Sequence, residues 1–185
     1  INHIVREIVT EMEVDKPSTA KLVADIQHEI PNVKADHKLI RTMLQNLLTN
    51  SFEAAAERGC VITVTTGVVA CTAEYLQSSF LFEEQLPGKY LRLEVNDTGQ
   101  GMEPDVMAKM FDPFFSTRFT GRGLGMSIVL GIVRIHRGCI FVESEPGSGT
   151  KVVIVLPVDA QMELKSDQTA ITTTGAVAID KGSSN

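Results

Sequence analysis

The feature that most constrains this chain is a short alternating segment that ends at an acid and a glycine-broken loop. Apolar and polar residues alternate from Tyr90 to Val95, which predicts a β-strand with one buried face. Asp97 follows this strand, and Gly99 and Gly101 permit backbone conformations and close approaches that a side chain would obstruct. The sequence therefore predicts a carboxylate fixed at a strand end beside an open loop.

The carboxylate of Asp97 has two interpretations. An ionised carboxylate only accepts hydrogen bonds, so it would select a ligand edge that carries a donor, such as the adenine amine, over the carbonyl oxygen of guanine. Asp-Thr-Gly is also ordinary Asx-turn chemistry. This stretch alone does not separate a binding residue from a turn.

Composition narrows the class of protein. The 185 residues, 43% hydrophobic and 22% charged, are enough for one core. A net charge of −6 without a long basic run argues against a nucleic-acid partner. The longest strongly apolar stretch, 124–135, contains Gly131 and Arg134 and is too short to cross a bilayer, so direct membrane contact is not expected. Three widely spaced cysteines without a CxxC pair predict reduced, mostly buried thiols in a cytoplasmic protein.

Hydrophobic periodicity predicts an α/β chain in which three main helices pack on a mixed sheet of about five strands. The helices are expected at residues 1–12, 36–58 and 126–136, and the strands at 22–30, 61–69, 90–95, 139–144 and 150–156. Residues 73–87 are expected to form an irregular connection with one helical turn, and 104–110 show helical traces. His28 is expected on a sheet face rather than at a ligand.

Both ends of the sequence carry an expectation about domain organisation. The first helix is cut at its start, which suggests a piece of a longer protein. After Pro157 the composition shifts to Ser, Thr, Ala, Gly and Asp. We therefore expect one domain over residues 1–157 and a disordered tail or linker over 158–185.

One side of the helix expected at 36–58 is polar. Asn46, Asn50, Glu53 and Glu57 are four, three and four residues apart, which places them on the same face. Asparagine in a helix interior costs roughly half a kcal/mol relative to alanine, so at least one of the two is expected to have a function. The alternative is a solvated polar face.

A phenylalanine-rich segment and a glycine run lie between the strand of Asp97 and the last helix. Residues 111–119 include four phenylalanines in an apparent loop, which must fold back on the body or on a ligand. We expect residues 102–120 to form a mobile lid. Gly121, Gly123 and Gly125 then lead into a helix, and such a turn presents free backbone donors to an anion such as phosphate. The spacing matches neither a dinucleotide fingerprint nor a P-loop, so the run alone is weak evidence.

Taken together, five segments in this order resemble the catalytic, ATP-binding domain of bacterial sensor histidine kinases, within the superfamily of gyrase, chaperone, histidine kinase and mismatch-repair ATPases. The segments are 46–54, 97–102, 111–117, 121–126 and 145–150. The likeness covers residues 1 to about 157 and is greatest to nitrogen-regulator-type and hybrid kinases. It implies a Bergerat-type two-layer α/β sandwich that binds ATP and Mg²⁺.

The resemblance also implies roles for residues. Asp97 would accept from the adenine amine, Thr150 would steady a bridging water, and Asn50 would give an oxygen ligand to Mg²⁺. Arg118 and Arg122 would neutralise charge on the transferring phosphoryl group, or each is a solvated surface residue. The other implied nucleotide positions are Gly99, Gly101, Met102, Phe114, Thr117, Gly121, Gly123, Leu124 and Gly125.

Asn46 separates a kinase from a hydrolase in this resemblance. In the ATPases of the superfamily a glutamate at this position activates water, whereas an amide has no basic group at neutral pH. The implied reaction is transfer of the γ-phosphoryl group to a histidine on a dimerisation domain, and from there to a receiver aspartate. No hairpin with an acceptor histidine fits before Asp15, so this chain is not expected to phosphorylate itself. The rivals are an ATPase, an anti-sigma-type serine kinase and a nucleotide-sensing interaction module.

Overall fold

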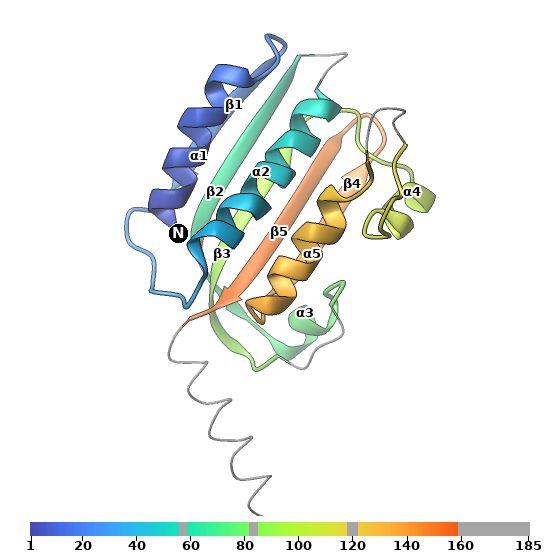
Figure 1. Ribbon diagram of the computed structural model, residues 1–185. Coiled ribbons are helices and arrows are strands. Elements are labelled where there is room, and N and C mark those ends of the chain that lie inside the picture. Colours follow the sequence, from blue (N-terminus) through green and yellow to red (C-terminus); the bar gives the residue numbers. More distant parts are fainter. Residues whose placement is uncertain (56–58, 82–84, 118–121, 159–185) are drawn as a thin grey trace, which may run out of the picture.

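The computed structural model of this chain describes residues 1–55, 59–81, 85–117 and 122–158. Its strands form one five-stranded mixed sheet in the order β1-β2-β3-β5-β4 (Figure 1). They are β1 (Ala20–Ile26), β2 (Cys60–Cys71), β3 (Gly88–Asp97), β4 (Cys139–Glu145) and β5 (Gly149–Pro157). The β1–β2 pair is parallel, and the other three pairs are antiparallel.

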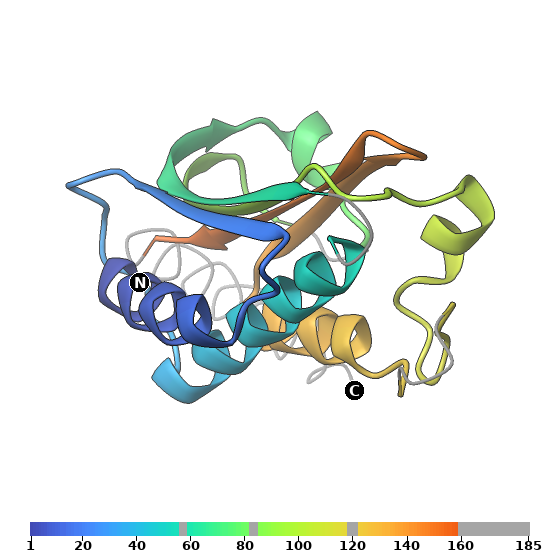
Figure 2. The same ribbon diagram turned by 90° about the horizontal axis from the view of Figure 1, so that it is seen from above.

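The main helices form a second layer on one face of this sheet. They are α1 (Asn2–Asp15), α2 (His37–Ala54) and α5 (Gly125–Ile135). Figure 2 shows them side by side below the sheet, while the short helix α3 (Ala73–Gln77) lies on the opposite side. The other short helix, α4 (Pro104–Lys109), stands beyond the edge of the sheet. The predicted two-layer α/β fold with about five strands and three main helices is confirmed.

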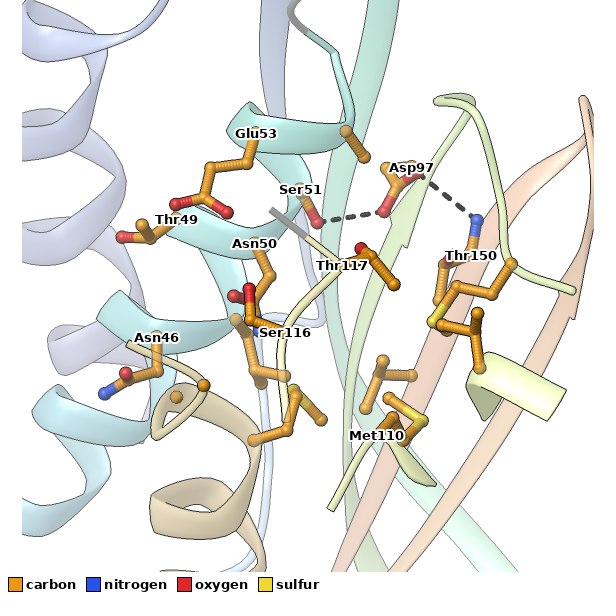
Figure 3. A pocket seen from close by; sticks show the side chains of 18 of the residues that line it. Asn46, Thr49, Asn50, Ser51, Glu53, Asp97, Met110, Ser116, Thr117 and Thr150 are labelled. Atoms are coloured by element: carbon orange, nitrogen blue, oxygen red, sulfur yellow. Dashed lines mark hydrogen bonds between the residues drawn. The ribbon is translucent and has the colours of Figure 1, made fainter. Parts of the chain in front are cut away.

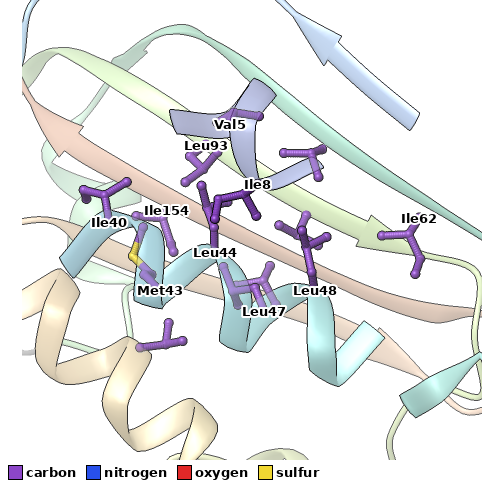
Figure 4. Packing of buried hydrophobic residues seen from close by; sticks show 14 of the residues in the cluster. Val5, Ile8, Ile40, Met43, Leu44, Leu47, Leu48, Ile62, Leu93 and Ile154 are labelled. Atoms are coloured by element: carbon purple, nitrogen blue, oxygen red, sulfur yellow. The ribbon is translucent and has the colours of Figure 1, made fainter. Parts of the chain in front are cut away.

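The main core lies between the two layers and is centred on α2. Ile40, Met43, Leu44 and Leu48 of α2 have no exposed surface, since their spacing puts them on the face toward the sheet. They pack against side chains from α1 and from the strands, including Val5, Ile8, Ile62, Leu93 and Ile154 (Figure 4). Burying each such side chain contributes about 1.5–3 kcal/mol. This packing fixes the position of α2, which carries Asn46 and Asn50.

The N-terminus of α2 is tied to the C-terminus of α5. Asp36 caps α2 as predicted, and its carboxylate accepts from the backbone N–H groups of Lys38 (2.8 Å) and Leu39 (3.0 Å). The Asp36 N–H donates to Nε2 of the buried His136 at 3.0 Å, and His136 Nδ1 lies 2.7 Å from the Ile132 carbonyl oxygen. One imidazole therefore joins the end of α5 to the start of α2.

The first strand is shorter than predicted. The expected strand at 22–30 is wrong at its end, because β1 stops at Ile26 and its ladder with β2 ends there. The side chain of Gln27 replaces the next ladder bond by accepting from the Val68 N–H at 3.2 Å. The side-chain amide of Asn2 donates to the Gln27 carbonyl oxygen at 2.8 Å. His28 is exposed beyond the strand end, so its expected place on a sheet face is also wrong.

Apart from the end of α2, the remaining boundaries agree closely with the prediction. The described part of α2 ends at Ala54, with Ala55 as its C-cap, and not near residue 58; residues 56–58 are outside the described part of the chain. α3 is the single helical turn expected within 73–87. Within the described residues, no helix combines the length and the apolar character needed to span a membrane. The predicted tail also lies outside the described residues, except for Val158.

Candidate functional site

A pocket of about 650 Å³ opens where the C-terminal half of α2 faces the end of β3 and the start of α5 (Figure 3). Its wall also includes the loop after β3 and the phenylalanine-rich segment. Most of the predicted site residues line it: Asn46, Asn50, Asp97, Gly101, Met102, Thr117, Arg122, Gly123, Leu124, Gly125 and Thr150. Gly99 and Phe114 do not, and Arg118 and Gly121 lie outside the described residues.

Asp97 is the buried acid of this pocket, with 5% of its surface exposed. Its Oδ1 accepts from the backbone N–H of Gly99 at 2.9 Å and of Thr150 at 3.3 Å. Its Oδ2 accepts from the hydroxyl of Ser51 at 3.0 Å (Figure 3). Burial raises the pKa of Asp97, and these hydrogen bonds lower it in part. Asp97 is therefore both a turn residue and a pocket acid, so the two sequence interpretations are compatible.

The glycines of the first loop serve close packing. A side chain at Gly99 would put its Cβ 2.8 Å from the Cβ of Ala54, so the loop lies directly against the end of α2. Gly101 has a φ of +66°, and a Cβ there would overlap the carbonyl group of Glu145. Gly99 thus acts through the backbone that supports Asp97, while Gly101 also lines the pocket.

The hydroxyl of Thr150 belongs to a small network at the other side of the loop. Its Oγ1 lies 2.9 Å from the Oγ of Ser144. The Ser144 hydroxyl oxygen accepts from the backbone N–H of Met102 at 2.9 Å, and its own hydroxyl lies 3.1 Å from the Gly149 carbonyl oxygen. The β4–β5 hairpin therefore holds the loop after Asp97 in place.

Two asparagine oxygens lie beside the first residue of α5. Asn46 turns its Nδ2 away to donate to the Thr42 carbonyl at 2.8 Å. A Cβ built on Gly125 would lie 3.2 Å from Asn46 Oδ1 and 3.5 Å from Asn50 Oδ1. Among the residues that the structure describes, no side chain caps the N-terminus of α5, and the first N–H groups of a helix lack partners within the helix. Amide oxygens and helix-end donors therefore meet at one point of the pocket.

The phenylalanine-rich segment packs against the second glycine run. The Phe114 N–H donates to the Gly123 carbonyl at 2.8 Å. Gly123 has a φ of +64°, and a Cβ there would lie 2.5 Å from the Phe115 carbonyl oxygen. Phe111 folds back onto Phe80, with ring centroids 5.0 Å apart, and Phe115 lines the pocket. For Phe114 the expected covering is wrong, because 79% of its surface is exposed at a φ of +69°. Phe119 is outside the described residues.

Known proteins resemble this chain in both sequence and fold. The sequence profile described as "Histidine kinase-, DNA gyrase B-, and HSP90-like ATPase" matches residues 35–160. The chain belongs to this ATPase family. One curated relative is the sensor kinase CckA of Brucella abortus, 37% identical over 139 residues, which are 74% of this chain and 14% of CckA. Among solved structures, the catalytic domain of the histidine kinase ThkA is 25% identical with a TM-score of 0.65, covering 85% of this chain and 91% of that one.

A third similarity concerns the fold alone. Full-length ShkA, solved in complex with AMPPNP, is 22% identical with a TM-score of 0.65, over 84% of this chain and 29% of that chain. These comparisons support the assignment of this chain as the ATP-binding catalytic domain of a sensor histidine kinase, as the sequence resemblance implied. Because the chain spans only 14% of the length of CckA, the activity of a whole kinase is a matter for proposal.

The residues of the pocket fit ATP and Mg²⁺, the two groups that membership of this ATPase family implies. The pocket is lined by the buried carboxylate of Asp97, by the start of α5 with its helix-end donors, and by the oxygen-bearing side chains of Asn50 and Glu53. Mg²⁺ prefers oxygen ligands and keeps several waters. Within the described part of the chain, no group of three or more His, Cys, Asp or Glu side chains could hold a metal. An ion here would combine protein oxygens with phosphate and water ligands.

Several residues of the pocket were not predicted from the sequence. They include Ser51, Glu103, Val106, Met110 and Ser116. Ser51 had a usable signal, because it lies four residues after Leu47 and four before Ala55 on the apolar face of α2. A hydroxyl on a core-facing position needs a buried partner. The others lie in loops or in the short helix α4, where periodicity carries no information.

Proposed function

We propose that this domain binds Mg-ATP and donates the γ-phosphoryl group to a histidine on a separate dimerisation domain, from which a receiver aspartate takes it. The family supports ATP binding in two-component kinases. One observation carries the rest: a single pocket holds a buried carboxylate, two asparagine oxygens and an uncapped helix N-terminus. A cytoplasmic location is part of the proposal, because ATP is available there.

Each part of the pocket has a role in this proposal. Asp97 accepts from the adenine amine, while the Thr150 hydroxyl steadies a bridging water. The first N–H groups of α5 bind phosphate oxygens, and Asn50 gives one oxygen ligand to Mg²⁺, which neutralises phosphate charge when bound. Arg122, exposed at the pocket mouth, faces the transferring group, and Arg118 is proposed for the same work.

The transfer itself needs little covalent chemistry from the protein. A ring nitrogen of the acceptor histidine attacks the γ-phosphorus, the bond from that phosphorus to the β–γ bridging oxygen breaks, and ADP leaves. Catalysis is then mostly positioning and charge stabilisation. Asn46 stands where the ATPases of the superfamily carry a glutamate, and its amide cannot take a proton from water. Hydrolysis should therefore be slow relative to transfer.

A second candidate is a nucleotide-dependent interaction module without transfer. The observation that favours it is Phe114, which is 79% exposed on the segment that packs against the glycine run of the pocket. A change in that segment on nucleotide binding would move this exposed ring and so change the surface that a partner meets. Transfer to an acceptor decides between the two functions.

The test supplies the chain with γ-labelled ATP and dimerisation domains of related sensor kinases. We expect acid-labile label on the acceptor histidine, no label on the chain alone, and little free phosphate. Asn50→Ala should abolish transfer, while Gln45→Ala, an exposed position on the same helix, should leave it intact. Rapid phosphate release without an acceptor would favour an ATPase, and label on serine in a partner would favour a serine kinase. Nucleotide binding without any transfer would favour the interaction module.

A further inference from the structure

Ser51 carries a buried hydroxyl that is committed to Asp97. Only 4% of Ser51 is exposed, and its Oγ donates to Asp97 Oδ2 at 3.0 Å. The next residue back along α2, Asn50, turns to the phosphate end of the same pocket, whereas Ser51 turns to the sheet (Figure 3). Neighbouring residues on a helix point about 100° apart, so one turn of α2 serves both ends of the pocket.

The hydrogen bonds around Asp97 all run in one direction. Gly99 and Thr150 use backbone N–H groups, which can only donate, and both bind Oδ1. At Oδ2 the donor is the Ser51 hydroxyl. The direction of this hydrogen bond can reverse, because a hydroxyl both donates and accepts. A donated hydrogen bond from Ser51 favours the ionised carboxylate, and that form shows the pocket only acceptor lone pairs.

We propose that Ser51 is a positioning residue that sets the purine preference of the site by holding Asp97 as an acceptor toward the pocket. The inference rests on the proposed function, in which Asp97 reads the six-position of the purine. An amine there donates to a carboxylate, whereas a carbonyl oxygen is repelled by it. Ser51 thereby contributes to discrimination through its hydrogen bond to Asp97.

Loss of the hydroxyl would weaken this selection. Without it, Oδ2 is a buried oxygen with one fewer donor, and burial already raises the pKa of Asp97. A protonated carboxyl group can offer its own O–H to a carbonyl. Among the described residues, the other charged side chains that line the pocket are Glu53, Glu103 and Arg122. The shift in the pKa of Asp97 is caused by burial and by the three hydrogen bonds, and not by these charges.

The test compares ADP with inosine diphosphate, which carries a carbonyl in place of the adenine amine. Calorimetric titrations without metal isolate the purine end from the metal ligands. We expect Ser51→Ala to weaken ADP binding roughly tenfold, as for loss of a bond to a charged group, and to leave inosine diphosphate nearly unchanged. If Ser51→Ala does not fold, Ser51→Cys keeps a similar volume with a weaker donor and carries the same prediction.

The matched control is Ser79→Ala. Ser79 is also buried, with 5% exposure, and donates to the Ile140 carbonyl at 3.2 Å, but it does not line the pocket. Its loss should leave the ratio of the two affinities unchanged. If wild type prefers ADP, the inference is overturned when Ser51→Ala weakens the binding of both nucleotides equally or weakens neither. If wild type shows no preference and Asp97→Asn changes nothing, the proposed reading of the purine fails as well.

Discussion

Asp97 combines two demands that oppose one another. As an acceptor for a donor-bearing ligand it must be ionised, yet with 5% exposure it lies where a charge is poorly solvated. Burial is the largest cause of its raised pKa, and the donors Gly99, Ser51 and Thr150 offset it only in part. The chain thus keeps a carboxylate that is less stable than an exposed one, as expected at a functional site.

This conflict predicts an acid limit for ATP binding. Because the pKa of Asp97 is raised, acidification should protonate it at a higher pH than it protonates an ordinary aspartate, whose pKa is about 3.9. ATP affinity of wild type should fall as Asp97 is protonated, and titrations across a pH series would measure it. Asp97→Asn should lack this step, which separates it from protonation of the phosphates. An acid step of the same size in the variant would contradict the prediction.

The same shift affects stability with the opposite sign. The folded state binds the proton of Asp97 more tightly than the unfolded state does. Its contribution to the free energy of unfolding is therefore fully present below the unfolded pKa and is lost as the pH rises through the raised folded pKa. Denaturant curves across this range should show the step in wild type and not in Asp97→Asn.

Two segments that follow the strand of Asp97 in the sequence also line the pocket. The segment 111–117 and the glycine run before α5 bind each other through the Phe114 N–H and the Gly123 carbonyl. The close approach depends on Gly123, since a Cβ would lie 2.5 Å from the Phe115 carbonyl oxygen. By contrast, a Cβ on Gly131, in the middle of α5, would meet no atom within 4 Å.

These two glycines therefore predict opposite effects of alanine. Gly123→Ala should displace the segment and weaken ATP binding at least roughly tenfold, because the positive φ and the clash cannot both be relieved locally. Gly131→Ala should leave ATP binding unchanged and stabilise the domain by about 0.5–1 kcal/mol, the helix penalty of glycine. Titration calorimetry and thermal melts measure the two effects. Unchanged ATP affinity in Gly123→Ala would show that the segment does not support the pocket.

Sequence patterns predicted elements better than the contacts that join them. The six buried apolar residues of α2 follow the helical period, so its helix and its core face were predictable. β1 ended early because Gln27 uses its side chain in place of the ladder, which no periodicity encodes. The tie through His136 joins residues 100 positions apart and was likewise invisible. Local signals report period and turns, whereas such bonds exist only once the fold brings the residues together.

At the scale of the whole molecule, the sheet has a core on each face. The main core lies under α1, α2 and α5, and a smaller one forms on the opposite face around Tyr90, Cys139 and Phe141. Tyr75 of α3 stacks on Phe141, with ring centroids 4.3 Å apart. Cys71 and Cys139 belong to this second cluster and Cys60 to the first, and none of the three forms a disulfide bond.

Thiol reactivity should therefore report global unfolding. The cysteines are at most 4% exposed, and burial raises the pKa of Cys71 to about 11, so little reactive thiolate reaches solvent. A thiol reagent should modify the native domain slowly, and all three sites should react at once in denaturant. The time course of thiol release with a coloured disulfide reagent measures this. Rapid modification of the native domain would mean that the sheet opens without unfolding.

The central claim is that one pocket reads adenine through Asp97 and holds phosphate at the start of α5. Calorimetric titration of wild type and Asp97→Asn with a non-hydrolysable ATP analogue and Mg²⁺, with GTP as the competing base, tests it most directly. The account predicts that wild type binds the ATP analogue in preference to GTP and that Asp97→Asn loses at least roughly tenfold in affinity together with that preference. Equal affinity and equal base preference in the two proteins would contradict it.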